Sequence, residues 1–109
     1  MDFSEQISIS ETGTTIILDL LKKHNVKATF FSTVVFAKEV PHLIKRIINE
    51  GHELASHTYY HSIFEVSHLR ESKLELEKLS NSEVLGFRMP RMQPVDEKEI
   101  FNAGYKYNS

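Results

Sequence analysis

The segment HTYYH, residues 57–61, contains the pair of side chains best suited to bind a metal ion. His57 and His61 are four positions apart, a spacing at which two imidazoles can approach one cation from a helical turn or a tight loop. A neutral imidazole nitrogen is a good ligand for borderline metals such as zinc. Thr58 lies between them, and its hydroxyl could fix the loop or the orientation of a ring. Because a zinc site needs at least three protein ligands, the spacing alone leaves open a pair of surface histidines.

A second candidate for chemistry is FRMPR, residues 87–91, in which Arg88 follows an expected strand. The guanidinium group of Arg88 can hold a carboxylate through two parallel hydrogen bonds, and Pro90 would stiffen the turn. On spacing alone, a surface arginine ahead of a loop is the favoured interpretation.

The four remaining histidines favour structural roles over metal binding. His24 ends an expected helix, where a partial positive charge is stabilising, and His42 falls in the first turn of another. His68, near the start of a third helix, is expected in solvent. His52 follows Gly51 at the start of an expected strand, and we expect it in the core or supporting a ligand rather than on a metal.

The elements that must position these residues alternate between helices and strands. Apolar spacing and end signals predict helices over 12–24, 41–50, 67–80 and 94–104. Short β-branched and aromatic runs predict strands at 26–31, 52–56, 83–87 and 105–107. This order predicts an α/β fold with a parallel sheet, either open or closed into a barrel. Sites in such folds gather at the carboxyl ends of the strands, where both candidate segments fall.

The first expected helix has Thr12 as its N-cap and an apolar stripe of Ile16, Ile17, Leu20 and Leu21. No strand precedes this helix, and the last strand falls at the end of the sequence. We therefore expect residues 1–11 to be an N-terminal extension and residues 12–109 to be a partial domain. A parallel sheet built this way exposes unpaired edges, through which copies of the chain could associate.

The composition excludes several classes of protein. The 109 residues are 40% hydrophobic and 26% charged, with a net charge of -2, which fits one small globular domain. No broad basic field exists for nucleic acid or anionic lipid, so neither is expected as a partner. The chain has no cysteine, which excludes disulfides, thiolate zinc sites and thiol nucleophiles. It also lacks a signal-peptide pattern and an apolar run of ~20 residues, which leaves the cytoplasm as the default location.

Taken together, these segments resemble the polysaccharide deacetylase family, also called the NodB-homology domain or carbohydrate esterase family 4. ILDLLKKHNVKATFF (17–31) is similar to the family's first helix and second strand. EGHELASHTYYH (50–61) resembles its second motif, His-Ser/Thr-x-x-His, and GFRMP (86–90) resembles its third, Arg-x-Pro. AGYKYNS (103–109) matches the segment that usually follows.

The resemblance implies a fragment of a distorted (β/α) barrel and a metal-dependent hydrolase of carbohydrate metabolism. Such an enzyme acts on carbon–nitrogen bonds and removes N-acetyl groups from amino-sugar polymers or oligomers such as peptidoglycan or chitin. The resemblance also implies a divalent metal, commonly zinc, bound by one aspartate and two histidines, here His57 and His61. By the same resemblance, Thr58 supplies the motif's hydroxyl, Arg88 orients the base carboxylate and the backbone N–H of Arg91 donates to the oxyanion.

The sequence departs from the family pattern at its aspartates. The family's first motif pairs two aspartates after a strand, but Asp2, Asp19 and Asp96 are well separated here. We therefore expect no general base and no carboxylate ligand in the chain, and the family's acid histidine would lie beyond Ser109. Arg91 also stands where the family usually has an aromatic residue.

Two hypotheses follow from these departures. In the first, the chain is a piece of a deacetylase that holds zinc weakly and is inactive alone. In the alternative, it is a non-catalytic remnant that assembles through its exposed sheet edges.

Overall fold

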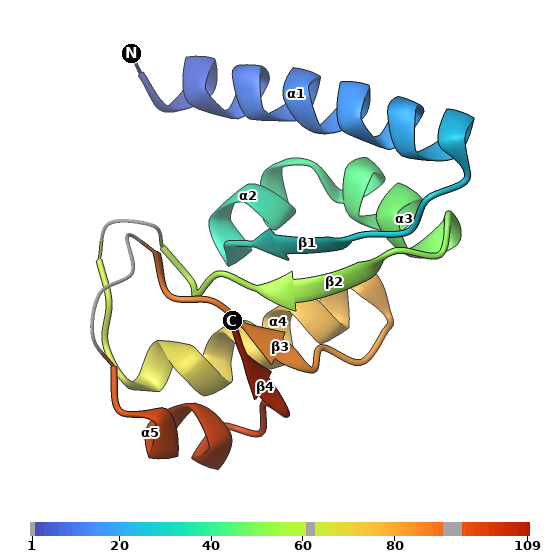
Figure 1. Ribbon diagram of the computed structural model, residues 1–109. Coiled ribbons are helices and arrows are strands. Elements are labelled where there is room, and N and C mark those ends of the chain that lie inside the picture. The colour runs from blue at the N-terminus through green and yellow to red at the C-terminus, as the bar shows by residue number, and fades with distance from the viewer. Residues whose placement is uncertain (1, 61–62, 91–94) are drawn as a thin grey trace.

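The computed structural model describes residues 2–60, 63–90 and 95–109. The helices are α1 (Phe3–His24), α2 (Val34–Glu39), α3 (Pro41–Asn49), α4 (Ser67–Ser80) and α5 (Glu97–Asn102). The strands are β1 (Thr29–Ser32), β2 (Glu53–Ser56), β3 (Gly86–Phe87) and β4 (Tyr107–Asn108). The strands form one parallel sheet in the order β1-β2-β3-β4 (Figure 1). The α/β fold with a parallel sheet is therefore confirmed.

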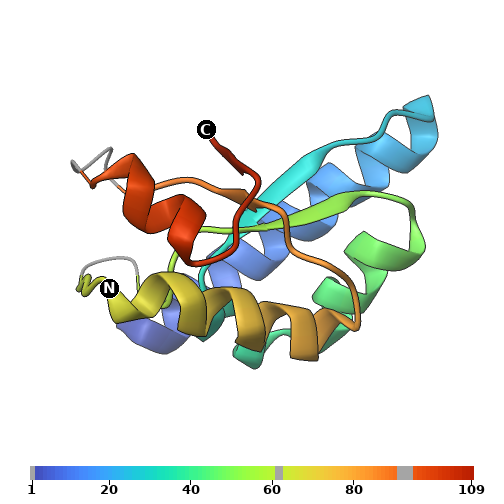
Figure 2. The ribbon, with the colours of Figure 1, turned by 90° about the horizontal axis from the view of Figure 1, so that it is seen from below.

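The core lies between the sheet and the helices on one of its faces. Helices α2, α3 and α4 lie on this face. Helix α1 lies past β1, at the edge of the sheet that is farthest from β4 (Figures 1 and 2). The strands contribute the buried side chains of Leu54 and Phe87. The helices contribute Ile44 and Ile47 from α3 and Leu76 from α4, which are also buried.

Helices α3 and α4 form where the sequence predicts them. Pro41 occupies the first turn of α3, where its missing N–H costs no hydrogen bond. In α4 the Nζ atom of Lys73 lies 2.7 Å from Oε2 of Glu77, an i, i+4 ion pair. Both helices have apolar residues at helical spacing and clear end signals, so local sequence is sufficient to place them.

Helix α1 is longer than predicted, because it begins at Phe3 rather than after Thr12. Its N-cap is Asp2, whose carboxylate accepts a hydrogen bond from the N–H of Glu5 at 2.8 Å. A capping aspartate satisfies one of the free N–H groups in the first turn, so the helix can start there despite the serines at positions 4, 8 and 10.

The predicted buried face of α1 is wrong for three of its four residues. Ile16, Ile17 and Leu20 are each at least half exposed, while Leu18 is fully buried. The extended helix carries apolar residues on two opposite sides, and only the side of Leu18 and Ile7 faces the core.

Helix α2 was not predicted at all. Its six residues are too few to show a helical apolar pattern, and it begins with two β-branched valines that favour strands. Thr33 caps it, with its hydroxyl accepting a hydrogen bond from the N–H of Phe36 at 3.2 Å.

The ends of the last elements also differ from the prediction. Helix α5 begins after Asp96, whose carboxylate accepts a hydrogen bond from the N–H of Lys98 at 2.9 Å. Strands β1, β3 and β4 each begin later than expected. No helix among the described residues combines the length and apolar character that a membrane span requires.

Two histidines show how tertiary packing decides burial. His68 is 9% exposed, so the prediction that it is solvated is wrong: its ring packs against Tyr59, Tyr60 and Phe64. His52 is buried as expected, and its Nδ1 atom accepts a hydrogen bond from the N–H of Ala28 at 3.1 Å.

Candidate functional site

The carboxyl ends of β1, β2 and β3 bring His57 and Arg88 together. Ser32, Ser56 and Phe87 lie side by side in the parallel register. The N–H of His57 donates to the carbonyl of Ser32 at 2.8 Å, and the N–H of Arg88 donates to the carbonyl of Ser56 at 2.9 Å. Each residue is the first after its strand, so the sheet itself fixes both backbones at the edge where α/β proteins carry their sites.

The ring of His57 is fixed by a carbonyl group. Its Nδ1 atom lies 2.8 Å from the carbonyl oxygen of Arg88. Because a carbonyl oxygen can only accept, Nδ1 carries the proton and the lone pair of the neutral ring is on Nε2. Histidines that bind metals are commonly oriented in this way, with one nitrogen donating to a carbonyl and the other serving as the ligand.

Thr58 holds a backbone conformation that is costly for its residue type. Its φ angle is 64°, in the left-handed region that β-branched residues rarely adopt. The side chain is fully buried, and its hydroxyl has no hydrogen-bond partner among the described residues. The expected support of a histidine ring by this hydroxyl is therefore not seen within those residues. Strain of this kind persists only where the surrounding structure imposes it, and it concentrates at functional sites.

Helix α2 supplies that surrounding structure. The N–H of Val34 donates to the carbonyl of Thr58 at 3.1 Å, and the N–H of Val35 donates to the carbonyl of Tyr59 at 3.3 Å. The ammonium group of Lys38 donates to the Tyr59 hydroxyl at 2.9 Å, and this hydrogen bond raises the pKa of Lys38. The free N–H groups of the first helical turn thus hold the loop after β2 in place. Sequence reasoning missed this contact because it missed the helix.

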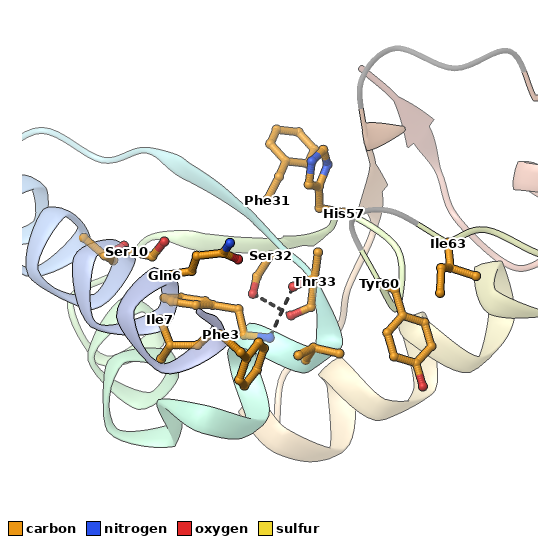
Figure 3. A pocket seen from close by; sticks show the side chains of 13 residues that line it. Phe3, Gln6, Ile7, Ser10, Phe31, Ser32, Thr33, His57, Tyr60 and Ile63 are labelled. Carbon is orange, nitrogen blue, oxygen red and sulfur yellow. Dashed lines mark hydrogen bonds between the residues drawn. The ribbon is translucent and has the colours of Figure 1, made fainter. Parts of the chain in front are cut away.

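A groove of about 650 Å³ opens beside His57 (Figure 3). In Figure 3 the side chains of Tyr60 and Ile63 lie on one side of it, and those of Phe3 and Ile7 from α1 lie on the other. Phe31 and Phe36 add further apolar surface. An apolar groove with a few polar groups is the common form of a small-ligand site.

None of the three aspartates joins His57. Asp2 and Asp96 cap helices, and the carboxylate of Asp19 pairs with Arg46 at 2.6 Å. Over residues 2–60, 63–90 and 95–109, no three His, Asp or Glu side chains gather as a metal site.

His61 and Arg91 lie outside the described residues. Their expected roles, as the second imidazole and as the backbone donor to the oxyanion, remain predictions. Among the described residues, His57 alone of the expected ligands is seen, and its tautomer and carbonyl partner are typical of a metal-binding histidine.

Known proteins resemble most of the chain. A family model described as polysaccharide deacetylase matches residues 5–106. A peptidoglycan-N-acetylglucosamine deacetylase of Bacillus cereus is 58% identical over 45 residues, which are 41% of this chain and 16% of that protein. A chitooligosaccharide deacetylase of Bradyrhizobium is 35% identical over 78 residues, which are 72% of this chain and 35% of that protein. The chain thus spans only a minor part of the curated relatives that it matches.

Solved structures share the fold. PdaA of Bacillus subtilis, a family 4 carbohydrate esterase, superimposes with a TM-score of 0.72 at 32% identity, covering 85% of this chain and 44% of that one. A CE4 family pseudoenzyme from Bacillus anthracis gives a TM-score of 0.75 at 28% identity, covering 87% of this chain and 37% of that one. From the family model, the relatives and the shared part of the (β/α) barrel, this chain belongs to the polysaccharide deacetylase family.

Proposed function

We propose that this chain supplies the histidine ligands of the metal site of a deacetylase. Such an enzyme removes N-acetyl groups from amino-sugar polymers. One observation carries the proposal: the Nδ1–H of His57 donates to the carbonyl of Arg88, which leaves Nε2 as the ligand nitrogen at the carboxyl edge of the sheet. The relatives named peptidoglycan and chitooligosaccharide deacetylases support the choice of substrate class.

In this proposal His57 and His61 bind a divalent cation, and zinc is the ion that a pair of imidazoles suits best. When bound, such a cation polarises an amide carbonyl as a Lewis acid. The guanidinium group of Arg88 is exposed at the end of β3, where it can orient a carboxylate. The groove beside His57 offers aromatic and aliphatic surface to the acetyl group and the sugar ring.

We further propose that this chain alone binds zinc weakly and does not turn over substrate. Its three aspartates are engaged elsewhere, so neither a carboxylate ligand nor a general base accompanies His57 among the described residues. Each missing ligand lowers metal affinity, and a missing base removes the group that would take a proton from water.

Zinc titration calorimetry of the chain and of its His57→Ala variant tests the metal site. We expect weak binding by the parent chain and none by His57→Ala, because the variant lacks one of two ligands. His24→Ala is the matched control, since His24 is an exposed histidine in the last turn of α1, and it should bind zinc as the parent does. Equal binding by the parent and His57→Ala would contradict the site.

Two further measurements complete the test. Hydrolysis of an acetylated chitin oligomer with added zinc should be undetectable, and turnover at rates typical of enzymes would contradict the proposed inactivity. Without metal, His57→Ala should lose at most about 1 kcal/mol of unfolding free energy, the value of one exposed hydrogen bond. If His57→Ala and His61→Ala both unfold the chain, the pair is structural.

The alternative proposal is a non-catalytic module that assembles through its sheet edges. Among the described strands, β1 has a neighbour only in β2, and β4 has one only in β3. Such edges present unpaired N–H and C=O groups to other strands. A monodisperse monomer in light scattering would count against this alternative.

A further inference from the structure

Helix α1 carries a second apolar face that has no neighbour in the described part of the chain. Ile9, Ile16 and Leu20 are 57%, 54% and 51% exposed. With Gly13 they fall at i, i+4, i+7 and i+11, a spacing that keeps side chains on one narrow strip of a helix. The strip lies on the side of α1 opposite the fully buried Leu18, so it faces away from the core. We call these four residues the outer stripe.

We infer that the outer stripe binds a second copy of this chain, with the two α1 helices antiparallel. Its four positions are symmetric about a point midway between residues 14 and 15. A two-fold axis at that point places Ile9 against Leu20 of the second copy and Gly13 against its Ile16. Every member of the stripe then meets another member, as a two-fold interface between identical surfaces requires.

Gly13 has no side chain, so it leaves a depression in the outer stripe into which a side chain of the second copy could pack. A Cβ atom at Gly13 would meet no heavy atom within 4 Å, and its φ angle is not among the positive ones. Glycine inside a helix costs about 0.5–1 kcal/mol relative to alanine, and nothing in the described chain requires it here. Facing Ile16 of the second copy, the glycine lets the two helices approach closely.

Charge favours an antiparallel second copy over other occupants. Glu5 and Lys23 are exposed near the two ends of α1, on the same flank of the outer stripe. Within residues 2–60, 63–90 and 95–109 neither forms an ion pair. In the antiparallel pair, Glu5 lies within about 1.5 Å of the level of the second copy's Lys23, one residue of helical rise. The contact occurs twice, whereas a parallel pair would leave Glu5 about 27 Å from the second copy's Lys23 along the helices.

Sedimentation of the full chain over a range of concentrations tests the interface. We expect a concentration-dependent dimer, and we expect Ile16→Gln to weaken it by about tenfold or more. Leu74→Gln is the matched control, because Leu74 is 51% exposed on α4, away from α1, and it should leave the dimer unchanged. Both variants alter exposed side chains, so far-UV circular dichroism should match that of the parent.

Charge exchange and cross-linking test the orientation. Glu5→Lys should weaken the dimer, and adding Lys23→Glu in the same chain should restore it, because the exchange recreates opposite charges only in the antiparallel pair. The chain has no cysteine that would compete. A mixture of Ile9→Cys and Leu20→Cys, oxidised by dissolved oxygen, should therefore form a disulfide-linked dimer. Ile9→Cys alone should not, since the two Ile9 positions are about 16 Å apart along the helices.

Three results would overturn the inference. The first is a chain that stays monomeric at every concentration. The second is a dimer that Ile16→Gln leaves intact, as pairing at the edge of β1 would give. The third is efficient cross-linking of Ile9→Cys with itself, which would require another arrangement of the helices.

Discussion

At the scale of single residues, His57 is held through its backbone and its ring at once. Its N–H donates to Ser32 at the end of β1, and its Nδ1–H donates to Arg88 at the end of β3. One residue therefore connects the ends of both strands that flank β2. A ring fixed in this way loses little further freedom when it binds a ligand, which is the advantage of a preorganised site.

The next residue, Thr58, leads to a prediction about stability. Thr58→Gly should raise the free energy of unfolding by about 1 kcal/mol, because glycine adopts a positive φ without strain and removes a buried hydroxyl that lacks a described partner. Urea unfolding measures the change. Thr33→Gly is the control: it removes the N-cap of α2 and should destabilise the chain. A loss of stability in Thr58→Gly would show that the surroundings of Thr58 favour threonine.

At the scale of elements, the start of α1 is set by a single cap. Asp2→Ala should cost about 1 kcal/mol of unfolding free energy, because the N–H of Glu5 loses its acceptor. Thr12→Ala should cost nothing or stabilise slightly, since Thr12 lies in the helix interior, where alanine is the better residue. Chemical unfolding of both variants measures this order. The reverse order would place the helix start at Thr12.

One face of the sheet carries a hydrogen-bonded link between its strands. The hydroxyl of Tyr107 in β4 donates to one carboxylate oxygen of Glu53 in β2, and the hydroxyl of Thr29 in β1 donates to the other, each at 2.8 Å. Burial and the hydrogen bond to Glu53 raise the pKa of Tyr107 from 10.0 to about 12. The side chains thus connect strands that the sheet order separates.

This raised pKa predicts a loss of stability in alkali. The folded state keeps the phenol proton to a higher pH than the unfolded state, so the contribution of Tyr107 is complete below about pH 10 and is lost as the pH rises to about 12. The difference in unfolding free energy between the parent and Tyr107→Phe should therefore shrink over this range. Urea unfolding at several pH values measures the difference. A difference that stays constant would show that Tyr107 ionises alike in both states.

At the scale of the whole molecule, local signals were sufficient for some elements and not for others. Helices α3 and α4 follow from their apolar spacing, and the alternation of elements gives the parallel sheet. The start of α1, the short α2 and the burial of His68 depend on one cap and on tertiary contacts. The outer face of α1 shows the same limit, because apolar periodicity cannot tell which of two faces meets the core.

The sequence singles out the residues of the candidate site but not the contacts that hold them. The spacing in HTYYH and the position of Arg88 after a strand singled out both segments. The acceptor for His57, however, is the backbone carbonyl of Arg88 rather than its side chain, and any residue there has a carbonyl. The hydrogen bonds from α2 to the loop after β2 also join two backbones. Contacts between backbone groups depend on the fold and not on the residue types, so the sequence does not predict them.

The two hydrogen bonds from α2 give the loop after β2 an internal reporter. The N–H groups of Val34 and Val35 donate to the carbonyls of Thr58 and Tyr59, so their exchange with deuterated solvent depends on whether the loop stays in place. In a nitrogen–proton spectrum, the resonances of these two N–H groups would thus report the opening of the loop without a probe attached near His57. If added metal slows the exchange of these two N–H groups, the loop that carries His57 opens less often when the metal is bound.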